Sequence, residues 1–162
     1  MDFNDIVKNH MRRMMVYTTP DEPLADVIFR MSDANTDIAV VKSNDQLAGV
    51  ITESDIYYAL VKSVLPDPLN PEKKLQDITD LKVVEVMRGP PAKKVMESCE
   101  RVGIHPCVDT FEDDTIENAI RVMQRSGLHH LLVNDQNNNL VGTISLGDII
   151  KSFGRSKVKN KR

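Results

Sequence analysis

One phrase of sequence occurs twice in this chain, and it constrains the fold more than any other feature. Gly-Val-Ile-Thr-Glu-Ser-Asp spans residues 49–55, and Gly-Thr-Ile-Ser-Leu-Gly-Asp spans residues 142–148. Both copies read Gly-x-Ile-[Ser/Thr]-x-x-Asp-Ile. A short β-branched run after the glycine predicts a strand that ends at the hydroxyl residue. The aspartate, Asp55 or Asp148, then falls in the first turn of a helix.

The predicted junction of strand and helix has a specific chemistry. Amides at a helix start lack partners within the helix, so together with the hydroxyl of Thr52 or Ser145 they can hold a phosphate or another polar group. The carboxylate of Asp55 or Asp148 accepts hydrogen bonds only, which suits two adjacent ribose hydroxyls. An ordinary helix N-cap also places an acid three positions after a hydroxyl residue, and one copy alone would fit that simpler interpretation.

The sequence upstream of the phrase repeats as well. Each half predicts the order strand, helix, strand, strand, helix. A shift of 92 residues aligns Val16 with Val108 and Val41 with Val133, and one extra residue in the turn at 134–139 makes the shift 93 for the phrase itself. The simplest account is two copies of one supersecondary unit, and 162 residues are enough to give both copies a core.

This doubled pattern resembles a tandem pair of CBS domains, the cystathionine-β-synthase-type repeat that usually occurs in twos as a Bateman module. The resemblance implies a mixed α+β fold in which two β-α-β-β-α repeats pack about a pseudo-twofold axis. The predicted division of the chain is a lead-in at 1–15, a first repeat at 16–65, a linker with the lead-in to the second repeat at 66–104, a second repeat at 105–154, and a basic tail at 155–162.

The resemblance also implies a ligand. Such pairs leave two clefts between the repeats that commonly take adenosine-containing molecules such as AMP, ADP, ATP or S-adenosylmethionine. By this likeness Asp55 and Asp148 would hold the ribose, and Thr52 and Ser145 would contact phosphate or its equivalent. Adenine would lie against residues of the strand that precedes the phrase, which are Ile38, Val40, Leu128 and Leu132.

Two further threonines, Thr18 and Thr110, stand where members of this family often approach the ligand. Each also begins a turn before a helix, and both interpretations stay open.

The two predicted clefts differ in charge. In the second repeat His129 and His130 stand where relatives that bind nucleotides often carry basic residues, whereas Asp37 and Ile38 occupy the matching positions of the first. A carboxylate there would repel a phosphate chain, while an imidazole can donate a hydrogen bond and gain charge as a phosphate approaches. The sequence therefore favours the second repeat for a phosphorylated ligand. The alternative is that one imidazole is a surface residue and the other is half buried.

The segment between the repeats is the least informative. Residues 83–87 predict a short packed element, and Lys93–Met96 resembles Val7–Met11 in the lead-in. The lead-in itself predicts a short helix followed by a basic turn at Arg12. When these two segments are aligned, the second repeat has extra residues, an insertion at about 97–103.

Composition limits the classes of function. The net charge of −3 gives no electrostatic reason to expect nucleic acid, and the absence of a long apolar run gives none to expect a membrane; a reducing cytoplasm is the default compartment. Cys99, His105 and Cys107 match no common zinc motif, so no metal is expected. The basic residues after Lys151 are expected to be solvated, with contact to a partner as the alternative.

Together these features predict a non-catalytic regulatory module that needs no cofactor, binds an adenosine-containing ligand and signals to an unidentified partner protein. The alternative is a dimerisation or interaction module whose clefts are vestigial. Apolar residues beyond those needed for one helix face also predict a homodimer, and these are Ile56, Tyr57, Ala59, Leu60 and Val64.

Overall fold

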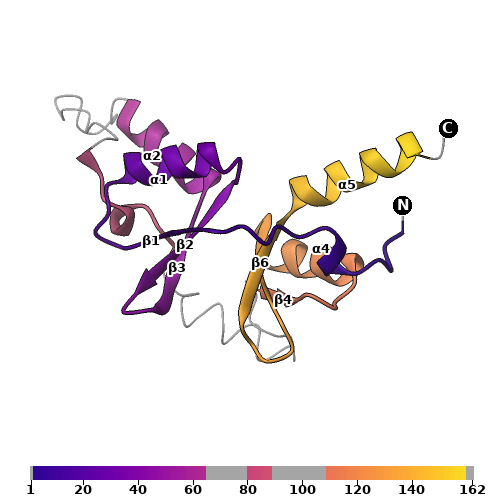
Figure 1. The fold of residues 1–162 in the computed structure, drawn as a ribbon. Helices are drawn as coiled ribbons and strands as arrows, with labels where there is room; N and C mark the ends of the chain where they lie inside the picture. Colours follow the sequence, from indigo (N-terminus) through magenta and orange to yellow (C-terminus); the bar gives the residue numbers. More distant parts are fainter. Residues whose placement is uncertain (1, 65–79, 89–108, 160–162) are drawn as a thin grey trace. The chain divides into compact units, whose positions relative to one another are not determined.

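The computed structural model describes residues 2–64, 80–88 and 109–159 (Figure 1). The chain divides into two compact units. The first unit is Met15–Pro90, and the second combines Met1–Met14 with Pro91–Arg162. The N-terminal fourteen residues therefore belong with the C-terminal repeat.

The first unit follows the predicted β-α-β-β-α order. Its sheet has the strand order β1-β2-β3, with β1 parallel to β2 and β3 antiparallel to β2. Among the described residues, the 3-10 turn η3 comes after α2 in the sequence. The elements are β1 (Val16–Thr18), α1 (Leu24–Asp33), β2 (Ile38–Ser43), β3 (Gln46–Thr52), α2 (Glu53–Val64) and η3 (Val83–Glu85).

The second unit repeats this arrangement. Its sheet has the order β4-β5-β6 with the same parallel and antiparallel pairs. The 3-10 turn η1 comes from the chain's N-terminus, where the sequence predicted a short helix. The elements are η1 (Val7–Asn9), β4 (Asp109–Phe111), α4 (Ile116–Ser126), β5 (His130–Asn134), β6 (Leu140–Ser145) and α5 (Leu146–Lys159). The predicted α+β class is thus confirmed.

Each unit has its own core, on the face of the sheet that the helices cover. Alternate residues of the strands and residues spaced three or four apart on the helices meet there, as their two periodicities require. The core of the first unit contains Val16, Leu24, Val27, Met31, Ala39, Val41, Ile51 and Val83. The core of the second contains Val7, Ile116, Ala119, Val122, Met123, Leu131, Val133, Ile144 and Ile149.

Two equivalent positions end the first helix of each repeat. Gly127, at the C-cap of α4, has a φ of 67°, and Asn35, just after α1, has a φ of 48°. These left-handed conformations suit glycine and asparagine, which explains why both helices end there. At the other end of α4, Thr115 caps the helix by accepting a hydrogen bond from the Asn118 amide at 3.2 Å.

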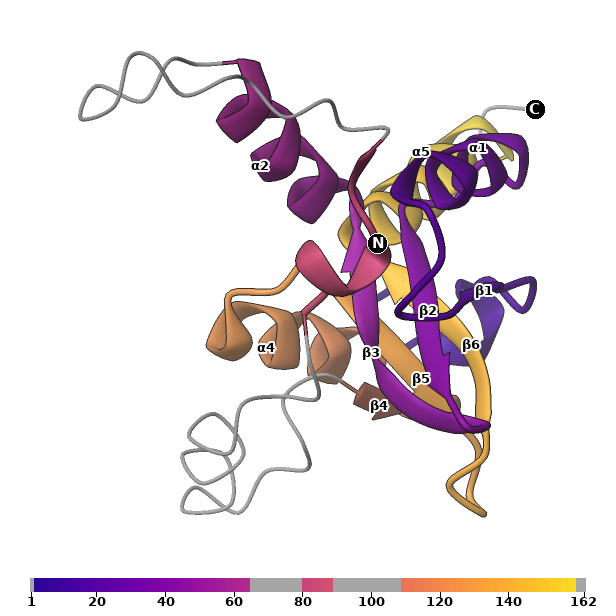
Figure 2. The same cartoon turned by 90° about the vertical axis from the view of Figure 1, so that its left-hand side faces the viewer.

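Two segments of similar sequence dock on the two repeats, and we call Asp5–Arg12 and Leu81–Arg88 the docking segments. Both contain Val-x-x-x-Met-Arg, and the valine is fully buried in each (Val7 and Val83). In Figure 2 the segment of residues 80–88 runs beside β3, within the first unit. The N-terminal segment docks in the second unit, although it precedes the first repeat in the sequence.

The docking segments make the same backbone hydrogen bonds in both units. The Val7 amide donates to the Asp114 carbonyl at 2.8 Å, and the Val83 amide donates to the Glu22 carbonyl at 3.0 Å. Residues 93–96, which echo the N-terminal segment in sequence, lie outside the described residues. The segment that occupies the equivalent place is Leu81–Arg88.

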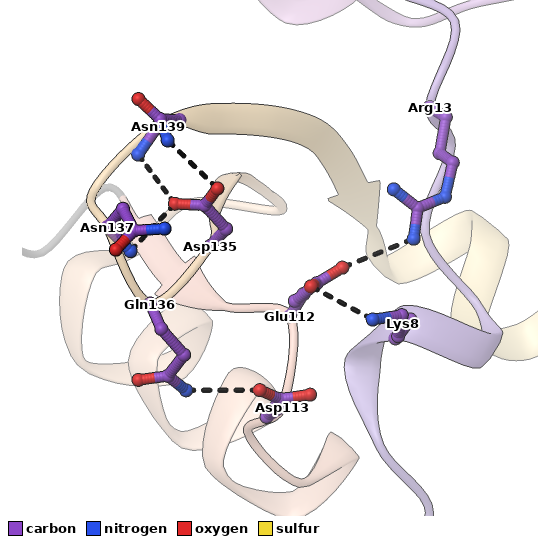
Figure 3. A network of polar contacts seen from close by, with 8 residues as sticks. All are labelled: Lys8, Arg13, Glu112, Asp113, Asp135, Gln136, Asn137 and Asn139. Carbon is purple, nitrogen blue, oxygen red and sulfur yellow. Dashed lines mark hydrogen bonds and ion pairs between the residues drawn. The ribbon is translucent and has the colours of Figure 1, made fainter.

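Side chains add to the docking of the N-terminal segment. Figure 3 shows Glu112, in the turn after β4, accepting from Lys8 at 2.9 Å and from Arg13 at 3.2 Å. Nearby, Asp135 accepts from the amides of Asn137 and Asn139 at 2.8 and 2.9 Å and so shapes the turn before β6.

The helix α5 continues to Lys159, so the predicted basic tail is helical over its first residues. Within the described parts of the chain, no helix combines the length and the apolar character that crossing a membrane requires.

Candidate ligand-binding site

The two copies of the repeated phrase form the same capping arrangement at the start of α2 and of α5. The Asp55 Oδ2 accepts from the Thr52 amide at 3.0 Å and from the Thr52 hydroxyl at 2.7 Å. The Asp148 Oδ2 accepts from the Ser145 amide at 3.2 Å and from the Ser145 hydroxyl at 3.0 Å. Both aspartates are buried, each with 8% of its surface exposed. The helix-capping interpretation of the phrase is therefore realised in both copies.

The second oxygen of each aspartate is paired with an arginine of a docking segment. Arg88 donates through Nε to the Asp55 Oδ1 at 2.5 Å, and Arg12 donates through Nε to the Asp148 Oδ1 at 2.7 Å. A buried carboxylate needs such a partner, because an unpaired charge away from water is costly. Neither arginine was among the residues predicted to form the site, although the recurrence of Val-x-x-x-Met-Arg in the sequence is a signal for both.

The glycine of the phrase allows the arginine segment to approach. A Cβ on Gly142 would lie 2.4 Å from the Arg12 carbonyl oxygen, and one on Gly49 would lie 2.1 Å from that of Arg88. Next to each glycine the backbones exchange two hydrogen bonds. Arg12 pairs in this way with Thr143 at 2.8 and 2.9 Å, and Arg88 pairs with Val50 at 2.9 and 3.1 Å. The glycines thus bring each arginine to its aspartate.

The amides at the helix starts differ from the sequence-based expectation that they are unpaired. The Leu146 amide, the first of α5, donates to the His129 carbonyl at 2.9 Å, and the Glu53 amide, the first of α2, donates to the Asp37 carbonyl at 3.0 Å. The Asp148 amide, the third of α5, donates to the Ser145 hydroxyl at 3.1 Å. These three amides, which were expected to be available to a phosphate, therefore already donate hydrogen bonds within the chain.

A comparison with protein-family models explains why the capped aspartate occurs twice. The model of the CBS domain matches residues 5–62 and again residues 100–155, which together make up more than half of the chain. The chain belongs to the CBS domain family. Both copies of the capped aspartate lie within the matched ranges.

Individual relatives agree with this assignment. The uncharacterised protein MJ1426 of Methanocaldococcus jannaschii is 30% identical over 157 residues, which cover 91% of this chain and 90% of that protein. Two solved structures show the same fold at low identity. The CBS domain pair of protein MJ0100, in complex with 5′-methylthioadenosine and S-adenosyl-L-methionine, has a TM-score of 0.65 at 16% identity, and the match covers 94% of this chain and 98% of that chain. The CBS domain protein PAE2072 from Pyrobaculum aerophilum, complexed with AMP, has a TM-score of 0.61 at 17% identity and covers 89% of both chains.

Three of the strand residues predicted to lie against adenine are buried, and their orientation follows from the strand pattern. Ile38 and Val40 alternate along β2 with Ala39 and Val41, which belong to the helix-covered core of the first CBS repeat. They therefore point to the opposite face of the sheet. Ile38 pairs across the sheet with Thr52, which places it next to the capped aspartate.

The second CBS repeat shows the same alternation along β5. Leu132 is buried, while its neighbours Leu131 and Val133 belong to the helix-covered core. His130 pairs with Ser145 and is half-buried, and Leu128, just before the strand, is also half-buried. Their role in binding stays a prediction.

The two histidines of the second CBS repeat differ in exposure, in line with the alternative interpretation given for them. The His129 side chain is exposed, and the His129 carbonyl is the acceptor for the first amide of α5. Asp37 has the same backbone role in the first CBS repeat, which confirms that the two positions are equivalent. The charge difference predicted between the repeats therefore lies at matched places beside the capped aspartates.

The threonines of the first strands are held in their turns. The Thr18 hydroxyl donates to Glu22 at 2.6 Å, and the Thr110 hydroxyl donates to Asp114 at 2.7 Å. Both threonines are buried. The turn interpretation is thus realised in both repeats, and contact with a ligand stays a prediction.

The contacts of Glu22 lead to a prediction about stability. The guanidinium of Arg30 and, to a smaller degree, the Thr18 hydroxyl hold the pKa of Glu22 below its ordinary value of 4.5. A lowered pKa means that the contacts of the ionised Glu22 stabilise the fold above about pH 4.5 and are lost as the pH falls through the folded-state pKa. We expect Glu22→Gln to lower the free energy of unfolding by about 0.5–1 kcal/mol near neutral pH. Urea unfolding of wild type and Glu22→Gln at about pH 7, 4.5 and 3 should show that their difference in free energy of unfolding becomes smaller as the pH falls. A difference that does not change with pH would contradict this role of the ionised Glu22.

Over residues 2–64, 80–88 and 109–159, no three His, Cys, Asp or Glu side chains are grouped so that they could hold a metal ion. Cys99, His105 and Cys107 lie outside the described residues, as does the predicted insertion at 97–103.

Proposed function

We propose that this protein is a regulatory module without catalytic activity that binds an adenosine-containing ligand at Asp55, at Asp148 or at both, and that a partner protein reads the occupied state. The observation that carries the proposal is the buried carboxylate at a helix start, beside a hydroxyl residue, in each of two CBS repeats. AMP, 5′-methylthioadenosine and S-adenosyl-L-methionine, the ligands of PAE2072 and MJ0100, share an adenosine whose ribose carries two adjacent hydroxyls.

The roles of the residues follow from their chemistry. The carboxylate oxygens of Asp148 accept hydrogen bonds, and their burial strengthens the bonds that they make with a ribose diol. Each sheet offers apolar residues on the face away from its helices, Ile38 and Val40 in the first repeat and Leu132 in the second, against which an adenine ring can lie. His129 supplies a donor for a phosphate in the second repeat, where the first repeat has Asp37.

The first test of the proposal is a calorimetric titration with AMP. We expect Asp148→Ala to weaken AMP binding by about 1.5–3 kcal/mol, or about ten- to a hundredfold, because it removes a charge-assisted acceptor from a buried site. Asp55→Ala should weaken AMP binding less, because Asp37 disfavours a phosphate near that site. Asp135→Ala, in an exposed turn, is the matched control and should leave affinity unchanged. Equal losses for both site variants would contradict the asymmetry, and turnover of the bound nucleotide would contradict the non-catalytic assignment.

A second candidate function is dimerisation with vestigial sites. The pairing of both aspartates with arginines favours it, because each carboxylate is already satisfied within the chain. If no adenosine-containing ligand binds at millimolar concentration, this candidate replaces the first.

Both candidates include a homodimer. Tyr57 and Tyr58 of α2 are exposed by 60% and 61%, and Leu60 lies on the same helix with 40% exposed, whereas Ile56 packs against the core. Large exposed apolar side chains on one helix are typical of an interface between subunits. We expect light scattering at tens of micromolar to give about twice the 18.3 kDa mass of the chain, and Tyr57→Asp with Tyr58→Asp to give the monomer. A monomeric wild type would contradict this expectation.

A further inference from the structure

We propose that Arg12 and Arg88 gate the two aspartates: in each repeat the arginine of the docking segment and the ribose of the ligand compete for one carboxylate, so that ligand binding displaces the arginine. The inference rests on the proposed function and adds the regulation of the same site. The juxtaposition that carries it is a buried aspartate whose two oxygens are both in use within the chain.

The number of acceptor positions makes the competition necessary. A carboxylate has about four lone-pair positions, two on each oxygen. On Asp148, Oδ2 already accepts from the amide and the hydroxyl of Ser145, and Oδ1 accepts from the Nε of Arg12. About one position is left, whereas a ribose diol that binds through both hydroxyls needs two. The helix cap is local and buried, so the contact that gives way is the arginine.

The arginine side chain has room to move while its backbone stays anchored. Asp148 is 8% exposed, but Arg12 is 26% exposed and Arg88 is 43% exposed. The amide and the carbonyl of Arg12 remain paired with Thr143 across the close approach at Gly142. A displaced guanidinium therefore stays beside the site.

This placement has a consequence for ligand choice. A guanidinium that leaves a carboxylate needs another anion, and phosphate matches its planar array of donors. A ligand with a phosphate compensates for the broken ion pair, whereas adenosine does not. The gate should therefore favour AMP over adenosine, and removing the arginine should reduce that preference.

Both arginines stand next to the parts of the chain that connect the two units in sequence. Arg12 stands a few residues before β1 of the first unit, although it docks in the second, and Arg88 precedes residues 89–108, which lead to β4.

The test compares Arg12→Met with wild type by calorimetry with adenosine and AMP. Competition predicts that adenosine binds about five- to tenfold more tightly to the variant and that the ratio of AMP to adenosine affinity falls. Arg13→Met is the matched control, since Arg13 is adjacent and paired with Glu112 instead; both affinities should be unchanged. Arg12→Gln, which keeps a neutral donor, should fall between Arg12→Met and wild type.

Each other outcome has a defined meaning. Wild type that binds both ligands and an Arg12→Met variant with unchanged or weaker adenosine binding overturn the gate and leave the proposed function standing. A wild type and a variant that both bind neither ligand overturn the proposed function and the gate together. Ligand binding to the variant but not to the wild type supports the gate in its strongest form.

A measurement on unaltered protein covers the case in which the variants fold poorly. In a nitrogen-15 correlation spectrum the Nε–H signals of Arg12 and Arg88 report directly on the hydrogen bonds to Asp148 and Asp55. Saturation with AMP is expected to shift at least one of them and to speed its exchange with water. Both signals unchanged at saturation overturn the gate.

Discussion

Gly142→Ala is expected to lower the free energy of unfolding of the second unit by about 3 kcal/mol, because the added methyl would lie 2.4 Å from the Arg12 carbonyl oxygen. The obstacle is backbone, so no side chain can turn away from it. Relief requires the docking segment to withdraw, which breaks two backbone hydrogen bonds to Thr143 and pulls Arg12 from Asp148. Differential scanning calorimetry measures the loss.

The control for this substitution is Gly154→Ala in α5, where nothing lies within 4 Å of the added methyl. Alanine favours a helix over glycine, so this variant should be stabilised by about 0.5–1 kcal/mol. Gly49→Ala should repeat the large loss in the first unit, where the corresponding distance is 2.1 Å. A Gly142→Ala variant as stable as wild type would contradict the close approach.

Val7→Ala is expected to destabilise the second unit by about 2 kcal/mol, since it removes two methyl groups from a fully buried core position. The location of the effect matters more than its size. Hydrogen exchange should show lost protection in α4 and β6, whose residues share the core with Val7.

Val83→Ala is the matched variant of the first unit. It should cost about the same and should show lost protection in α1 and β3 instead, because Val83 packs with those elements. If Val7→Ala loosened the first repeat, which follows it directly in the sequence, the observed docking would be contradicted.

The strands and helices could be predicted because their signals are local. The order strand, helix, strand, strand, helix that was predicted for each half is the order observed in both units. Two copies of each pattern doubled the information. The extent of α5 was harder to predict, because the charged residues after Lys151 are equally typical of a solvated helix and of a tail.

The arginine partners of the aspartates have a weaker signal, which is only the recurrence of Val-x-x-x-Met-Arg. A capping box lies within four residues of sequence, so Thr52 and Asp55 reveal it directly. The ion pair of Arg12 with Asp148 joins residues 136 positions apart, and no periodicity links them. The roles predicted for the twelve binding residues depend on a ligand, and the titrations described above are what will test them.

The docking of the N-terminal segment also sets an order of events during synthesis. The first unit is one continuous stretch of sequence, and its ion pair of Arg88 with Asp55 joins residues 33 positions apart. This unit can therefore fold while later residues are still being synthesised. Lys8 pairs with Glu112, which is synthesised 104 residues later. At ordinary rates of translation the delay between the two residues is about 5–20 s. During that interval Val7 and Met11 have no core to enter. Val7 and Met11 therefore leave the ribosome well before the residues against which they pack, and the growing chain exposes an apolar segment to which a chaperone or a neighbouring copy can bind.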